Sequence, residues 1–140
     1  IIKEIEKEIF ETKSSLIFTH HYNDLNLDHR VAYEATITAA RPVPDSKVSS
    51  IISFEIPAAT DWRKPYKFNP NLHIDISSQL TTKVNALKAY EYEFRKPPHP
   101  RSKEITEAVA KRWGSLSGFK AAEAFEIVMS RMSNLDKISL

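Results

Sequence analysis

The stretch SSLIFTHHYNDLNLDHR, residues 14–30, joins an apolar run to a polar loop that leads into the next element. Its apolar part, LIF, follows a Ser-Ser turn and predicts a short strand over 14–19. The twelve residues 19–30 hold three His, two Asp and two Asn, but no Lys or Glu. Because these side-chain types ligate metals or move protons, the stretch is a candidate site at the end of a strand.

Outward from this stretch the chain alternates between helical and extended patterns. Helices are predicted over 2–13, from His29 to about Ala40, from Ser77 or Ser78 onwards, over 103–113 and over 120–132, and further strands over 47–56 and 73–77. We expect Asp28 to cap the helix that opens at His29. Such alternation predicts an α/β sheet covered by helices, in which ligands bind at the carboxyl ends of the strands. The polar stretch lies at such an end.

Composition narrows the function classes. The 140 residues fit one domain, and a net charge of +2 is too small to predict binding to nucleic acid. Absence of cysteine excludes disulfides and thiol catalysis and fits a cytoplasmic protein, while two glycines are too few for a phosphate-cradling loop. No apolar run is long enough to span a membrane. A predicted helical stripe of Phe125, Val128, Met129 and Met132 suits a core or a subunit contact, which leaves a homo-oligomer open.

The chemistry of the polar stretch has two interpretations. His29, at a helix start, can aim its ring at the strand ends as a metal ligand, while Asp24 and Asp28 serve as ligand, base or partners that fix a His tautomer. Alternatively, Asp28 caps the helix, Asp24 and Asn26 form turns, and the histidines are solvated. The spacing matches no local metal motif such as H-E-x-x-H.

The stretch THHYNDLNLDHRVAYEATITAARP resembles a signature of the LmbE-like, PIG-L-type zinc-dependent de-N-acetylases. In that signature a His-rich loop ends in an Asp-His pair that opens a helix. The blocks SFEIPAATDW (53–62), FNPNLHIDIS (68–77), ALKAYEYEFRKPPHPRS (86–102) and GSLSGFKAAEAF (114–125) resemble successive blocks of the same family. Together they cover roughly residues 14–128.

The resemblance implies an α/β, Rossmann-like three-layer sandwich with a mostly parallel sheet. Residues 1–140 would be a single domain that forms only the C-terminal part of a larger de-N-acetylase domain. The implied activity is metal-dependent removal of an N-acetyl group from an N-acetylglucosamine-type amino sugar, and His29 is the implied ligand of Zn²⁺ or another divalent metal. The family's other ligands and its general base come from an upstream HPDD-type motif, which this sequence lacks. One His cannot hold a catalytic zinc.

Further residues receive roles by combining the resemblance with their chemistry. Many family members have a His three residues before the ligand, where this chain has Asn26, which can donate a hydrogen bond to an oxyanion but cannot deliver a proton. His20 or His21 would then supply the proton, with His21 preferred. Asp28 orients a neighbouring group or simply caps the helix.

Substrate binding is assigned to Asp24 and to two residues of the Pro-rich loop, His99 and Arg101. Arg can pair bidentately with an anionic group, although a plain surface turn explains the same loop equally well. The competing hypothesis for the whole chain is a non-catalytic binding domain of the same architecture that has lost its metal site.

Overall fold

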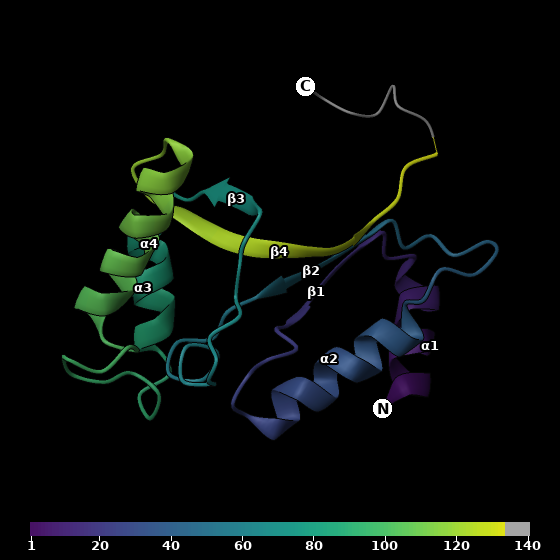
Figure 1. Ribbon diagram of the computed structural model, residues 1–140, viewed down its shortest axis with the longest axis horizontal. Helices are drawn as coiled ribbons and strands as arrows, with labels where there is room; N and C mark the ends of the chain where they lie inside the picture. Colours follow the sequence, from purple (N-terminus) through teal and green to yellow (C-terminus); the bar gives the residue numbers. More distant parts are fainter. Residues whose placement is uncertain (134–140) are drawn as a thin grey trace.

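The computed structural model describes residues 1–133. Figure 1 shows helices at both ends of a small sheet. In chain order the elements are α1 (Ile2–Thr12), β1 (Leu16–His20), α2 (Leu27–Ala39), β2 (Ser50–Phe54), β3 (Leu72–Asp75), α3 (Leu80–Lys88), α4 (Lys103–Ser117) and β4 (Ala122–Ser130). The predicted helices near the N-terminus and over 103–113, and all three predicted strands, are confirmed.

The four strands form one sheet in the order β1-β2-β4-β3. β1 and β2 are parallel, with Phe18 opposite Ile52, while β4 is antiparallel to both β2 and β3. It follows that β1, β2 and β3 run in one direction and β4 alone runs in the other. The α/β class is therefore confirmed, with a mixed sheet in which three of the four strands run in one direction, and the carboxyl ends of β1 and β2 lie side by side.

The helix predicted over 120–132 is wrong, because residues 122–130 form strand β4. α4 ends at Gly118, whose left-handed backbone (φ 81°) stops the helix just before this segment. β4 then lies between β2 and β3, which supply backbone hydrogen-bond partners on both of its sides. Phe125 and Met129 consequently pack in the sheet rather than along a helical stripe. Pairing with distant strands overrides the local pattern here.

Two apolar clusters hold the helices on the sheet. The first gathers buried side chains below α1 and α2: Ala40, Val48 and Ile51, with Ile9, Ile17, Ile37 and Met129 packed against them. The second lies beneath α4 and contains Phe68, Trp113, Ala122, Ala124 and Val109. The polar loop packs against the second cluster, where the His21 ring lies edge to face on Phe68 with centroids 5.5 Å apart.

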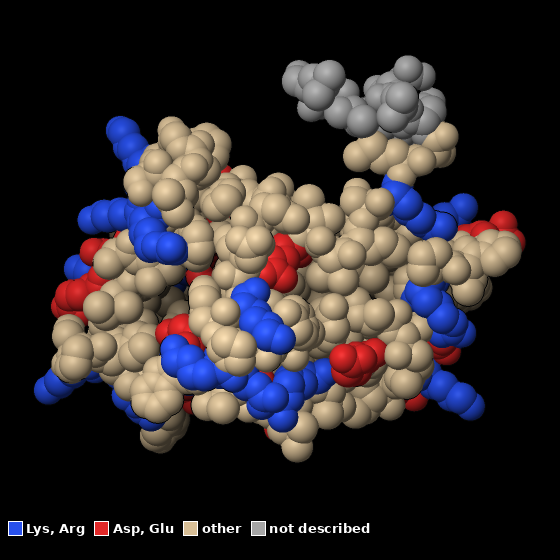
Figure 2. Space-filling view, in the orientation of Figure 1, with Lys and Arg blue, Asp and Glu red and all other residues tan. Residues whose placement is uncertain are grey.

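Surface features add little to the architecture. Figure 2 shows Lys and Arg side chains spread over the visible face, with acidic side chains between them. Among residues 1–133, no helix combines the length and apolar character needed to cross a bilayer.

Candidate functional site

The polar loop leaves the sheet at the carboxyl end of β1 and returns to it through α2. Its backbone is fixed locally: Asp24 N–H donates to the His21 carbonyl (3.2 Å), and Arg30 Nη1 donates to the carbonyls of Asp24 (2.7 Å) and Leu25 (2.8 Å). Arg30 thus bridges the first turn of α2 back to the loop. These contacts hold the loop in one conformation against the strand ends.

Asn26, not Asp28, caps α2. The Asn26 side-chain oxygen accepts a hydrogen bond from the Asp28 backbone N–H (2.9 Å), while Asp28 lies exposed within the first turn. The predicted cap at Asp28 is therefore wrong by two residues. Asn was overlooked as a cap because Asp28 directly precedes His29, although both residue types are good caps. The Asp28 carboxylate accepts no hydrogen bond within the described part of the chain. Its negative charge lies in the first turn of α2 and interacts favourably with the positive end of the helix dipole.

Asp24 is the buried centre of the loop. Its side chain is fully buried; Oδ1 accepts from the Asn26 N–H (2.8 Å) and Oδ2 from the Thr60 hydroxyl (2.7 Å). Oδ1 also lies 3.1 Å from Nδ1 of His29, a close electrostatic contact without the alignment of a straight hydrogen bond. The Thr60 hydroxyl in turn accepts from the Ile56 N–H (2.8 Å), which ties the network to the loop after β2.

The contact with Asp24 determines which nitrogen of His29 is available. A carboxylate at Nδ1 places the ring proton there, and the neutral ring then presents Nε2 as a lone-pair donor. Histidines that bind metals use this arrangement, in which a carboxylate at one nitrogen orients the other towards the ion. His29 is about one-fifth exposed, so Nε2 is accessible from outside.

His29 opens onto a cavity of about 420 Å³ that brings three of the expected site residues together. Asn26, His29 and Arg101 all line it, although Arg101 lies more than seventy residues away along the chain. Arg101 Nε donates to the Pro57 carbonyl (3.1 Å), and its guanidinium is paired with Glu93. Both Pro57 and Glu93 also line the cavity.

The other expected residues lie outside the lining of this cavity. Asp24 is buried behind His29, Asp28 is on the exposed first turn, and His99 accepts a hydrogen bond at Nδ1 from the Arg101 N–H (3.1 Å). His99 therefore shapes the turn that carries Arg101. Asp24 contacts His29 directly, so its observed position suits a role in orienting that ring.

His21 is completely buried and faces the protein on both sides of its ring. Nδ1 accepts from the Asn23 N–H (3.1 Å), and Nε2 lies 3.2 Å from a Glu126 carboxylate oxygen on β4. Burial lowers the pKa of His21, and the nearby Glu126 charge opposes that shift. In this conformation His21 links the loop to the sheet.

His20, rather than His21, lies against His29. The two rings stack with centroids 4.1 Å apart and an interplanar angle of 17°. Burial lowers the pKa of His20, and the neighbouring His29 lowers it further. The adjacent histidines in the sequence indicated that one ring of the pair lies on each side of the strand. Strand alternation alone could not determine which of the two rings turns towards α2.

Thr60, Glu93 and Tyr90 were missed by sequence reasoning. Thr60 contacts Asp24, while Glu93 and Tyr90 line the cavity beside Arg101. Each belongs to a loop or turn far along the chain from His29, and no spacing rule connects such segments. These contacts depend on how the loops after β2 and α3 fold over the sheet end.

The described residues provide one metal-ligand position rather than a whole centre. Within residues 1–133 no group of three or more His, Asp or Glu side chains is arranged to hold a metal ion. His29, with Asp24 at its Nδ1, fits a single ligand position. A three-ligand zinc site of the catalytic type cannot be built from these residues.

The fold of this chain is similar to that of solved structures. No family model matches the chain. A conserved protein of Thermus thermophilus superposes with a TM-score of 0.69 at 16% identity, over 99% of this chain and 62% of that one. An N,N'-diacetylchitobiose deacetylase of Pyrococcus horikoshii, in complex with an inhibitor, superposes with a TM-score of 0.66 at 17% identity, over 98% of this chain and 55% of that one.

At these identities the two likenesses show the fold alone. The chain shares the α/β fold of both structures, and it spans less than two thirds of the length of either one.

Proposed function

We propose that this chain carries part of the active site of a metal-dependent hydrolase that removes the N-acetyl group from an N-acetylglucosamine-type amino sugar. The observation that carries the proposal is the Asp24–His29 pair at 3.1 Å, at the carboxyl end of β1, which leaves Nε2 of His29 accessible beside a cavity. The fold shared with an N,N'-diacetylchitobiose deacetylase supports the same reaction class.

In this proposal a bound Zn²⁺ or another divalent ion would supply polarisation of the amide carbonyl and activation of water. His29 supplies one ligand, while residues 1–133 hold no group of three or more His, Asp or Glu side chains arranged around an ion. Asp24 orients the His29 ring and is itself held by Thr60. Asp28 directly precedes His29 in α2 and adds negative charge beside it.

Two cavity residues bind the substrate in this proposal. The amide group of Asn26 donates a hydrogen bond to the developing oxyanion, since its oxygen is used in capping α2 while its NH₂ group makes no contact within the described chain. Arg101, positioned by Pro57 and by the turn that contains His99, binds sugar oxygens or an anionic substituent. His20, which stacks on His29, supplies the proton that the leaving amine requires, because His21, the candidate preferred from the sequence, is completely buried between Asn23 and Glu126.

The test is acetate release by the polypeptide that carries these residues in the cell, loaded with zinc. N-acetylglucosamine, N,N'-diacetylchitobiose and an aryl N-acetylglucosaminide are the substrates. We expect release of acetate from at least one of them and its loss, by more than a hundredfold, in His29→Gln. Glu34→Gln, an exposed change on the same helix, is the matched control and should retain activity.

A non-catalytic binding domain is the second candidate, and the absence of a three-ligand cluster within residues 1–133 favours it. Under this alternative the polypeptide binds the sugars but releases no acetate, and His29→Gln leaves sugar affinity unchanged. Acetate release that depends on His29 excludes it.

A further inference from the structure

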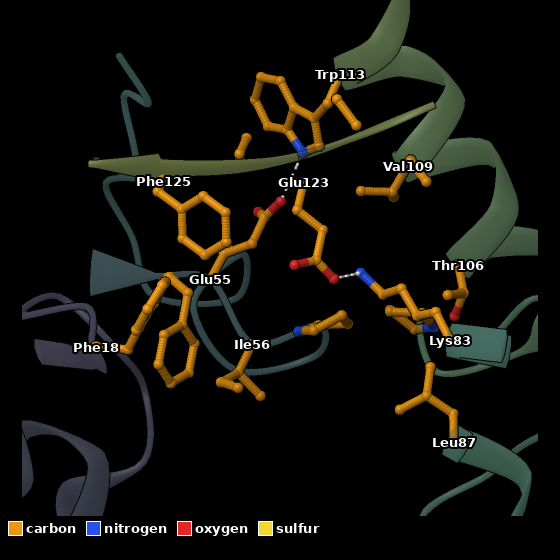
Figure 3. A pocket seen from close by; sticks show the side chains of 16 residues that line it. Phe18, Glu55, Ile56, Lys83, Leu87, Thr106, Val109, Trp113, Glu123 and Phe125 are labelled. Carbon is orange, nitrogen blue, oxygen red and sulfur yellow. Dashed lines mark hydrogen bonds and ion pairs between the residues drawn. The ribbon is translucent and has the colours of Figure 1, made fainter. Parts of the chain in front are cut away.

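A second cavity, of about 460 Å³, adjoins the one that contains His29. The two share four lining residues: Ile56, Pro57, Leu87 and Thr106. The two cavities are therefore neighbours. Figure 3 shows this cavity between the strand ends and the helices α3 and α4.

Its walls are mainly aromatic and aliphatic. Phe18 and Phe125 meet edge to face with ring centroids 5.5 Å apart, and Phe54 and Trp113 complete an aromatic wall. Leu87 and Val109 lie opposite, as Figure 3 shows. Phe18 is about half exposed, so part of this apolar surface is open to solvent. Cavities of this volume and composition are typical of sites for small molecules.

Two carboxylates project among these apolar walls. Glu55 accepts hydrogen bonds from Trp113 Nε1 (2.8 Å) and from the Tyr66 hydroxyl (3.3 Å), and Glu123 pairs with Lys83 Nζ at 2.6 Å. Because a carboxylate offers about four lone-pair sites, Glu55 keeps acceptor capacity beyond these two bonds. With one ammonium and two carboxylates, the cavity has a net formal charge of −1 when both Glu residues are ionised.

We propose that this second cavity binds the group attached to the amino sugar, and that this group is an apolar ring carrying an ammonium or hydroxyl donor that reaches Glu55. The assignment rests on the proposed function only for its link to the sugar; the ligand chemistry follows from the cavity itself. Apolar walls favour burial of a ring, Glu55 orients a donor, and the negative charge disfavours an anionic ligand.

Binding can be tested without any catalysis. Isothermal titration calorimetry with the complete polypeptide compares 2-phenylethylamine, 2-phenylethanol and phenylacetate, which share one ring but differ in charge. We expect the ammonium to bind about tenfold more tightly than the alcohol, as one charge-assisted hydrogen bond would give, and the carboxylate to bind most weakly.

Variants assign that preference to the cavity. Glu55→Gln should weaken the ammonium probe about tenfold and leave the alcohol within about twofold, while Val109→Trp should abolish binding of both by filling the cavity. Glu104→Gln, an exposed change on α4, is the matched control and should leave all three affinities unchanged. Thermal unfolding of each variant shows whether it is folded. If Val109→Trp does not fold, Glu55→Gln still tests the proposal.

Equal affinity for the three probes, no binding, or an unchanged ammonium affinity in Glu55→Gln would overturn the proposal. Probe binding in the expected order without acetate release would support the cavity assignment and contradict the proposed hydrolase. Acetate release without probe binding would support the proposed hydrolase and contradict the cavity assignment.

Discussion

Replacement of Asp24 tests the network on which the site depends. Asp24→Ala removes the acceptor for the Thr60 hydroxyl (2.7 Å) and for the Asn26 N–H (2.8 Å). Hydrogen bonds to a charged group contribute about 1.5–3 kcal/mol each, and breaking a buried polar network typically costs about 3–5 kcal/mol. We therefore expect the free energy of unfolding to fall by about 3–5 kcal/mol.

Equilibrium unfolding in urea, followed by far-UV circular dichroism, measures this loss. Asp28→Ala is the matched control, because it removes the same side chain from an exposed position four residues away and should cost no more than about 1 kcal/mol. The isosteric Asp24→Asn should fall between the two, since its amide oxygen can accept from only some of the same donors.

A double-mutant cycle isolates the central contact. Thr60→Val removes the hydroxyl that donates to Asp24, and the coupling energy between the two substitutions should be about 1–3 kcal/mol. A loss in Asp24→Ala no larger than that in Asp28→Ala, or a coupling energy near zero, would refute the reasoning that this carboxylate holds the loop.

Three further predictions concern stability. Gly114→Ala should lower it by about 1–3 kcal/mol despite alanine's better helix propensity, because a Cβ would lie 2.7 Å from the Phe119 carbonyl oxygen and 2.8 Å from Ala121 Cα; chemical unfolding measures the change. Burial raises the pKa of Glu55 above its ordinary 4.5, so the folded protein binds more protons than the unfolded chain and wild-type stability falls as pH rises through and above 4.5. Glu55→Gln should abolish that fall. Equal slopes of unfolding free energy against pH in the two proteins would contradict the assignment. Burial lowers the pKa of His21 below 6.5, so wild-type stability declines as pH falls below 6.5; His21→Gln should cost less at pH 5 than at pH 7.5, and a constant cost would contradict it.

Local signals in the sequence predicted most elements and one part of the site. The apolar run before THHYNDLNLDHR predicted β1, and the alternation of patterns predicted the α/β class. The position of the polar loop at a strand end predicted a candidate site there, and two of its residues, Asn26 and His29, line a cavity. Each of these inferences depends on residues close together in the chain.

Features that depend on distant contacts were not predictable in this way. β4 carries apolar residues at both helical and strand spacing, and its partners β2 and β3 decide the outcome. The hydrogen bond from Thr60 to Asp24, and the position of His20 rather than His21 against His29, likewise follow from how the loop after β2 packs on α2. Periodicity carries no information on such packing.

The central claim is that His29, oriented by Asp24, is a metal ligand, and the zinc content of the purified polypeptide tests it most directly. Elemental analysis should find about one zinc per molecule of the polypeptide that carries these residues in the cell, almost none in His29→Gln, and an unchanged amount in the Glu34→Gln control. About one zinc per molecule retained in a folded His29→Gln variant would contradict the account.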